Sequence, residues 1–185
     1  MNEIVVATGI PGVGKTTVIN NALKLISSEY EIINFGDMMF KHAKNENLAL
    51  DRDQMRKLDP KNQKRIQIMA AEEIYQKSQE KSVLVDTHCT IKTTKGFLPG
   101  LPQWVLKKLK PTKIVLIEAD NKEISKRRSS DATRVRDADS VEAIGEHQDM
   151  NRNIAMAYSV ISGATVSIVI NNDGQIDESL PSIGG

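Results

Sequence analysis

The feature that most constrains this chain is a glycine-rich turn near its start, residues 9–17, which reads Gly-Ile-Pro-Gly-Val-Gly-Lys-Thr-Thr. It follows residues 4–8, a run of apolar and β-branched residues that is typical of a strand buried on both faces of a parallel sheet. After the turn, apolar residues recur at helical spacing from Val18 to Ile26. A strand, a tight turn and a helix in this order open a βαβ unit, so the chain is expected to build an α/β fold.

Further strands and helices alternate along the rest of the chain. Apolar, β-branched runs predict four more strands, over residues 30–35, 82–86, 113–118 and 164–170. Between the second and third strands lies a helical stretch, in which Asp51 and the pair Asp59-Pro60 mark two helix starts. Two helices are predicted between the fourth and fifth strands, over residues 121–128 and 141–162. This alternation predicts a parallel sheet with helices on both faces and a ligand at the carboxyl ends of its strands.

The glycine-rich turn matches the phosphate-binding pattern G-x-x-x-x-G-K-[ST] at residues 9–16, between a strand and a helix as the pattern requires. Its glycines let successive backbone amides point at phosphate oxygens, and the helix N-terminus adds its positive end. Lys15 is expected along the β and γ phosphates, and the Thr16 hydroxyl is expected to bind Mg²⁺. The predicted fold is thus a P-loop NTPase-type five-stranded parallel sheet, and its predicted nucleotide-binding residues are Gly9, Ile10, Pro11, Gly12, Val13, Gly14, Lys15, Thr16 and Thr17.

Asp86 ends the predicted third strand, where P-loop proteins place the acid that holds Mg²⁺ directly or through water. The other interpretation of Asp86 is a helix or turn cap. The phosphate-binding pattern favours the metal role, so Thr16 and Asp86 form the predicted Mg²⁺ site.

A short polar stretch, residues 126–137, contains four arginines. The permanent charge and planar fork of arginine suit it to clamp phosphate oxygens while charge redistributes during transfer. The alternative is a solvated surface on which these arginines pair with Asp131, Asp137 and Asp139.

Composition excludes several classes of protein. The chain has 185 residues, which is the size of one domain, and 25 Lys and Arg against 24 Asp and Glu give a net charge of +1. We therefore expect neither nucleic acid nor an anionic membrane as a partner. No apolar run reaches the roughly 18–20 residues that a membrane-spanning helix needs. Residues 1–3 lack the basic region of a signal peptide, and Cys89 is the single cysteine, so a cytoplasmic location is expected.

Several blocks of sequence together resemble one family. The chain is similar to archaeal adenylate kinases, particularly the methanococcal type, from residue 4 to about residue 174. The blocks that carry the resemblance follow in the same order along the chain: the glycine-rich turn, then residues 34–38, 51–58, 85–88, 96–102 and 133–136. The glycine-rich turn alone indicates only a superfamily, whereas the other blocks indicate this family.

The resemblance implies transfer of the γ-phosphoryl group of MgATP to AMP, giving two ADP, within a single domain that assembles as a homotrimer. It implies a helical AMP-binding insertion at about residues 36–80 and a short lid at about residues 128–140. The catalytic residues implied are Lys15, Arg128, Arg134 and Arg136, and the AMP-binding residues implied are Gly36, Asp37, Arg56, His88 and Lys92.

The chain departs from the wider family after the third strand. Many adenylate kinases carry Asp-Gly-Phe-Pro-Arg there, whereas residues 86–90 read Asp-Thr-His-Cys-Thr. Lys92 is the residue we expect to supply the missing charge. His88 is interpreted either as a hydrogen-bonding residue of the AMP pocket or as a histidine satisfied near the core, and not as a base.

Two alternatives stay open. One is another P-loop kinase, acting on a different nucleoside monophosphate or on an alcohol, for which Asp37 would serve as the carboxylate near the hydroxyl. The other is a nucleotide-binding module that contacts RNA through the basic clusters at residues 61–65 and 107–110. The small share of aromatic residues, 4%, disfavours the second alternative.

Overall fold

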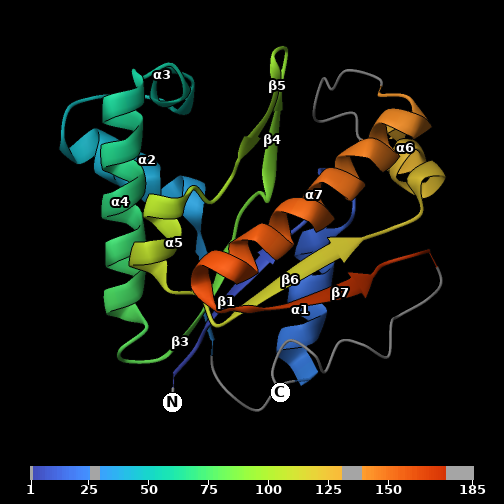
Figure 1. The fold of residues 1–185 in the computed structure, drawn as a ribbon, viewed down its shortest axis with the longest axis horizontal. Helices are drawn as coiled ribbons and strands as arrows, with labels where there is room; N and C mark the ends of the chain where they lie inside the picture. Colours follow the sequence, from blue (N-terminus) through green and yellow to red (C-terminus); the bar gives the residue numbers. More distant parts are fainter. Residues whose placement is uncertain (1, 26–29, 131–138, 174–185) are drawn as a thin grey trace.

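The computed structural model describes residues 2–25, 30–130 and 139–173. Its main sheet contains five parallel strands in the order β2-β3-β1-β6-β7, so the predicted fold class is confirmed (Figure 1). The strands are β1 (Ile4–Thr8), β2 (Tyr30–Asn34), β3 (Ser82–Asp86), β6 (Lys113–Glu118) and β7 (Thr165–Ile170). The strand that precedes the glycine-rich turn therefore lies in the centre of the sheet.

Helices cover both faces of this sheet. One face packs against α1 (Lys15–Leu25) and α6 (Asn121–Ser130), and the other packs against α2 (Phe35–Asn45), α4 (Pro60–Lys77), α5 (Gln103–Leu109) and α7 (Val141–Ser162). Successive strand residues supply the two cores, because Val5 of β1 faces α1 whereas Val6 faces the opposite helices. None of the helices in the described ranges is long and apolar enough to cross a membrane.

The helical insertion between β2 and β3 consists of α2, α3 (Arg52–Arg56) and α4. Asp51 and Asp59 cap α3 and α4, as predicted from the sequence. The predicted second strand was one residue too long, because Asn34 accepts a hydrogen bond from the backbone amide of Asp37 at 3.0 Å and α2 begins at Phe35. The insertion has a small core of its own, formed by Ala43, Ala49, Met55 and Ile66.

The segment between β3 and β6 contains elements that the sequence analysis did not predict. An antiparallel hairpin joins β4 (Thr90–Thr93) to β5 (Gly96–Pro99), and α5 follows it. Gly96 in the hairpin has a φ of +121°, a backbone conformation that side chains disfavour. In Figure 1 the hairpin stands away from the sheet, in the space between the helical insertion and the upper end of α7. The hairpin thus forms a separate two-stranded sheet that follows the carboxyl end of β3.

Tyr158 of α7 contacts the chain on both sides of the hairpin, just before β4 and just after β5. Its buried hydroxyl donates a hydrogen bond to the Cys89 carbonyl at 2.7 Å and accepts one from the Leu101 amide at 3.2 Å. Burial raises the pKa of this hydroxyl well above its usual range, so it stays protonated and able to donate. The roots of the hairpin are therefore fixed to α7.

We expect Tyr158→Phe to lower the free energy of unfolding by about 1–3 kcal/mol, because it leaves the buried Leu101 amide without its partner and removes one of the two hydrogen bonds to the Cys89 carbonyl. Urea unfolding followed by circular dichroism measures the change. Tyr75→Phe is the control, since it also removes a phenolic hydroxyl but keeps the ring that Lys110 contacts. Equal losses in the two variants would contradict the role given to Tyr158.

Candidate functional site

The glycine-rich turn has the backbone conformation that its sequence predicts. Gly12 and Gly14 have φ values of +94° and +81°, in the region that favours glycine. Gly9 is required for space, because a Cβ atom there would lie 2.5 Å from the Ile117 carbonyl oxygen of β6. The turn thus runs against the end of the neighbouring strand and delivers the chain to the N-terminus of α1.

Lys15, the first residue of α1, reaches the end of β3. Its ammonium group donates a hydrogen bond to the Thr87 carbonyl at 2.9 Å and forms an ion pair with Asp86. The other carboxylate oxygen of Asp86 accepts a hydrogen bond from the Asn34 side chain at 3.1 Å. The structure therefore brings together the predicted phosphate-binding lysine and the predicted metal-binding acid, which lie 71 positions apart in the numbering.

The residues at this edge fit a magnesium ion. Oδ1 of Asp86 is buried and, within the described ranges, has no hydrogen-bond donor besides the Lys15 ammonium group. Thr16 is exposed at the start of α1. One carboxylate and one hydroxyl are oxygen donors of the kind that Mg²⁺ uses beside substrate phosphates and water. No group of three or more acidic, histidine or cysteine side chains within the described chain forms a closed metal site.

The helical insertion carries three of the residues predicted for the AMP site. Gly36 and Asp37 lie in the first turn of α2, and Asp37 forms an ion pair with Arg52. Arg56 is the last residue of α3 and pairs with Asp53 at 3.0 Å. Arg56 has 67% of its side chain exposed, so the surrounding protein leaves its guanidinium accessible.

His88 lies in the connection between β3 and β4. Desolvation by neighbouring protein atoms lowers its pKa, and the positive charges of Lys15 and Arg56 lower it further. Asp86 acts in the opposite direction with a smaller effect than Lys15. The imidazole is therefore neutral near pH 7.

Arg128 and Lys92 meet at one carboxylate. Arg128 of α6 donates to the Pro11 carbonyl of the glycine-rich turn at 2.7 Å and to Asp139 at 2.9 Å. Lys92 of β4 donates to the other oxygen of Asp139 at 2.8 Å. Both cations lower the pKa of Asp139, with the Lys92 hydrogen bond having the largest effect. Asp139 therefore connects the hairpin, the turn and the start of α7.

The remaining arginines predicted for the lid, Arg134 and Arg136, lie outside the described residues. Of the three aspartates in the alternative interpretation, Asp131 and Asp137 also lie there. The Arg128 contact with Asp139 agrees with that alternative, whereas its contact with Pro11 places the same side chain on the glycine-rich turn.

A buried polar cluster under the hairpin was not predicted. Thr90 donates to the Asn151 side chain at 2.5 Å and lies 3.0 Å from Nε2 of His147, and the Phe97 ring packs on His147. Desolvation, followed by the charges of Arg128 and Lys92, lowers the pKa of His147. The cluster fixes the hairpin face that carries Lys92 against α7. Cys89 next to it is buried, and burial raises its pKa to about 12, which makes it an unreactive thiol.

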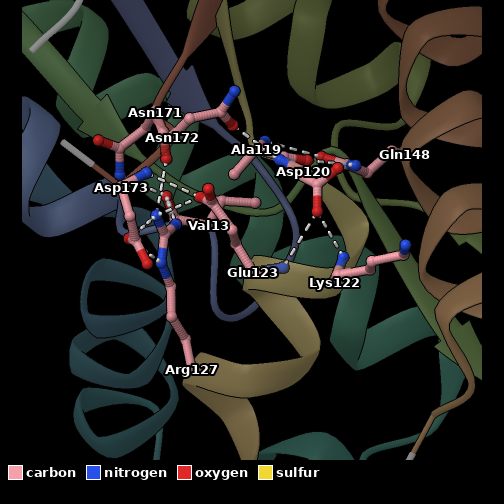
Figure 2. A network of polar contacts seen from close by, with 10 residues as sticks. All are labelled: Val13, Ala119, Asp120, Lys122, Glu123, Arg127, Gln148, Asn171, Asn172 and Asp173. Carbon is pink, nitrogen blue, oxygen red and sulfur yellow. Dashed lines mark hydrogen bonds and ion pairs between the residues drawn. The ribbon is translucent and has the colours of Figure 1, made fainter. Parts of the chain in front are cut away.

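Behind the glycine-rich turn lies a second network, shown in Figure 2. Arg127 of α6 donates to the Asn171 carbonyl at 2.9 Å and pairs with Glu123 at 3.1 Å and with Asp173 at 2.5 Å. In the sequence, Arg127 is one of four arginines in the polar stretch of residues 126–137. The spacing of four residues between Glu123 and Arg127 was the one sequence signal for this pairing.

A polar cavity of about 400 Å³ opens beside this network, at the end of β6. Its lining includes Glu118, Gln148 and Arg152. Both carboxylate oxygens of the buried Glu118 accept hydrogen bonds from Arg152, at 2.7 and 2.5 Å. Gln148 bonds the Ala119 carbonyl and the Asn121 side chain, so these groups order the start of α6.

Comparison with known proteins identifies relatives over nearly the whole chain. Residues 8–145 match a family described as an AAA domain. The adenylate kinases of Methanococcus vannielii and Methanocaldococcus jannaschii are each 52% identical over 185 residues, which cover 98% of this chain and 96% of theirs. The adenylate kinase of Methanothermobacter thermautotrophicus is 51% identical over 178 residues, covering 96% of this chain and 95% of its own.

Among solved structures, a shikimate kinase from Acinetobacter baumannii in complex with shikimate has a similar fold. It aligns with a TM-score of 0.52 and 14% identity over 90% of this chain and 84% of its own. At this identity the likeness concerns the arrangement of strands and helices alone.

Proposed function

The chain belongs to the adenylate kinase family, and we propose that the residues described above carry out transfer of the γ-phosphoryl group of MgATP to AMP. The observation that carries the proposal is the meeting of the glycine-rich turn, Lys15 and Asp86 at one edge of the sheet. The proposed organisation is a single domain, with the AMP-binding insertion at about residues 36–80 and the lid at about residues 128–140.

Residues 9–17 bind the phosphates of ATP. The positive φ values of Gly12 and Gly14 support this role, because such a backbone turns successive amides toward one side. The N-terminus of α1 adds its partial positive charge. Lys15 exchanges its Asp86 partner for phosphate oxygens, and the substrate thereby gains a cation that the fold has already placed at the loop.

Thr16 and Asp86 hold the magnesium ion together with the phosphates. When bound, the ion neutralises charge that develops on the transferring group. Asp86 is kept in place for this role by Asn34, the residue that also caps α2. The same asparagine thus connects the metal-binding acid to the first helix of the AMP-binding insertion.

Gly36, Asp37, Arg56, His88 and Lys92 form the AMP-binding side. The phosphate of AMP already carries an ionised oxygen at neutral pH, so the transfer needs alignment and charge stabilisation more than a base. Arg56 supplies an exposed cation for that phosphate, and the neutral His88 supplies a hydrogen-bonding group without adding charge. Arg128, Arg134 and Arg136 stabilise the charge of the transition state from the lid side.

We propose that the chain assembles as a homotrimer, as the resemblance to archaeal adenylate kinases implies. Exposed apolar side chains on α7 and on the edge strand β7 support an interface there: Met156, Val160, Ile161, Ile168 and Ile170. Apolar groups on an edge strand favour association with another protein surface.

We also propose a cytoplasmic location, which the single buried thiol supports, and no nucleic-acid partner. The two basic clusters considered for RNA are partly neutralised by acidic side chains. Arg65 pairs with Glu46, and Lys108 pairs with Glu72 at 2.6 Å.

The first test is phosphoryl transfer from MgATP to a panel of AMP, CMP, UMP, GMP and simple alcohols, with direct detection of the products. We expect conversion of AMP to ADP, and we expect Lys15→Ala to lower kcat by about 10²- to 10³-fold because a cation on the transferring phosphate is lost. An unchanged circular dichroism spectrum confirms that the variant is folded. Transfer to a different acceptor would remove the AMP site from the proposal, and near-normal turnover by the variant would remove Lys15.

A second test separates the two substrates. We expect Arg56→Ala to raise the KM for AMP by about tenfold, the size of one hydrogen bond to a charged group, and to leave the KM for MgATP nearly unchanged. Arg65→Ala is the control, because Arg65 is an exposed arginine of the same insertion that pairs with Glu46. An unchanged KM for AMP in Arg56→Ala would contradict the assignment.

A third test concerns assembly. Light scattering on the purified protein is expected to give a mass three times the 20.5 kDa of one chain. Val160→Asp is expected to give smaller species, because it introduces a charge into the proposed interface. Leu50→Asp serves as the control for mass, since Leu50 is similarly exposed, 80% against 85%, but lies before α3 in the insertion. A trimer that persists in Val160→Asp would place the interface elsewhere.

A further inference from the structure

The peptide bond between Val13 and Gly14 is held from behind by two side chains that are distant in sequence. We propose that Asn171, assisted by Arg127, is a positioning residue that orients the Gly14 amide toward the phosphates of the donor. The proposal rests on the phosphate-binding role given above to the glycine-rich turn. On this proposal, the residue that follows β7 helps to set the backbone conformation of the glycine-rich turn.

The contacts converge on one atom. The carbonyl oxygen of Val13 accepts a hydrogen bond from the Asn171 side-chain amide at 2.7 Å and a longer one from Arg127 at 3.4 Å. Figure 2 shows both side chains directed at Val13 from the end of β7 and from α6. The carbonyl thus has its partners on the side of the turn that faces these two elements.

Because the peptide bond is planar, the direction of the Val13 carbonyl fixes the direction of the Gly14 amide. In a trans peptide the C=O and the following N–H point in opposite directions. The structure contains no cis peptide bond in the described ranges. Because the Val13 carbonyl is directed toward Asn171, the Gly14 amide must point to the opposite side of the turn. An outward carbonyl also keeps its partial negative charge away from an approaching phosphate.

Gly14 is needed for the same arrangement. A Cβ atom on Gly14 would lie 2.4 Å from the Asn171 side-chain nitrogen, and its φ of +81° disfavours other residues. Asn171 thus approaches the turn as closely as glycine permits. The contact therefore depends on glycine at position 14.

Asn171 is itself fixed on several sides. Its backbone amide donates to the Glu118 carbonyl at 2.8 Å, and its carbonyl accepts from Arg127 at 2.9 Å. Arg127 in turn pairs with Asp173 and Glu123, and the Asp173 amide donates to Glu123 at 2.8 Å. These contacts hold Asn171 in place before the substrate binds. The turn is therefore preorganised, and binding does not have to pay for ordering it.

Asn171→Ala tests the proposal, with Asn172→Ala as the matched control. Asn172 lies in the same turn, and its side chain also forms a hydrogen bond with a backbone group, here as the acceptor from the Asp120 amide at 2.8 Å, but that bond does not involve the glycine-rich turn. Two probes are used, MgATP and inorganic tripolyphosphate with Mg²⁺, and their dissociation constants are measured by calorimetry. Steady-state kinetics adds the KM for AMP.

We expect Asn171→Ala to weaken both probes by about tenfold, since a preorganised hydrogen bond to a charged group is lost, and to change the KM for AMP by less than about twofold. Asn172→Ala is expected to bind both probes like the unaltered chain. Weaker binding of MgATP with unchanged tripolyphosphate would show that Asn171 acts on the adenosine part, and equal effects of the two variants would show a merely structural role. Either result overturns the proposal.

Asn171→Asp covers the case in which the alanine variant does not fold. It keeps the size of the side chain but replaces the donor by a carboxylate oxygen that faces the Val13 carbonyl, so we expect it to weaken tripolyphosphate at least as much. Unchanged binding by this folded variant would overturn the proposal. Tripolyphosphate binding requires neither AMP nor turnover. The effect of Asn171 on phosphate binding can therefore be measured even if the AMP-binding residues are assigned wrongly.

Discussion

The site depends on the hydrogen-bonded position of β1 between β3 and β6. Ala7 is in register with Asp86 on one side and with Val115 on the other, so the chain leaves β1 with a neighbouring strand on each side. The Thr87 amide donates to the Ala7 carbonyl at 3.2 Å and continues the ladder beyond β3. The turn that follows β1 therefore lies between the end of β3 and the end of β6. Lys15 pairs there with Asp86 of β3, and Gly9 lies against the backbone of Ile117 in β6.

The two adjacent arginines of α6 act on opposite parts of the same turn. Consecutive residues of a helix point about 100° apart. Arg127 can therefore reach the Val13 carbonyl and the end of β7, while Arg128 reaches the Pro11 carbonyl and Asp139. One helix thus braces the turn from behind and also connects it to the start of α7. A basic stretch that looks uniform in sequence has two distinct structural tasks.

Local signals in the sequence were sufficient for most of the fold. Each of the five strands of the main sheet contains a short cluster of apolar, mostly β-branched residues, and the helix starts at Asp51 and Asp59 carry their own capping groups, so each could be predicted from a few neighbouring residues. The hairpin of β4 and β5 was missed because its strands are short and largely exposed, with little apolar periodicity. It is held instead by distant partners such as Asn151 and Asp139.

For the site, the sequence predicted residue types better than contacts. The phosphate-binding pattern located Lys15, and the strand end located Asp86, but their ion pair follows from the order of strands, which no local pattern contains. The brace on Val13 is a stronger example. Asn171 lies 158 positions after Val13, and an asparagine at the end of a strand is an ordinary turn residue until the fold places it against the glycine-rich turn.

The charges of the site imply that binding is an exchange of partners. Each described cation assigned to a phosphate already pairs with a carboxylate: Lys15 with Asp86, Arg56 with Asp53, and Lys92 and Arg128 with Asp139. A small anion gains little from Lys15 and Arg128, because it must displace a carboxylate in a partly buried ion pair. In the proposed site a nucleotide phosphate chain contacts the turn amides and several cations at once, and its combined interactions can offset the loss of these ion pairs. The acids therefore favour a multiply charged, correctly spaced substrate over general anions, and they also keep a chain of net charge +1 from collecting unrelated polyanions.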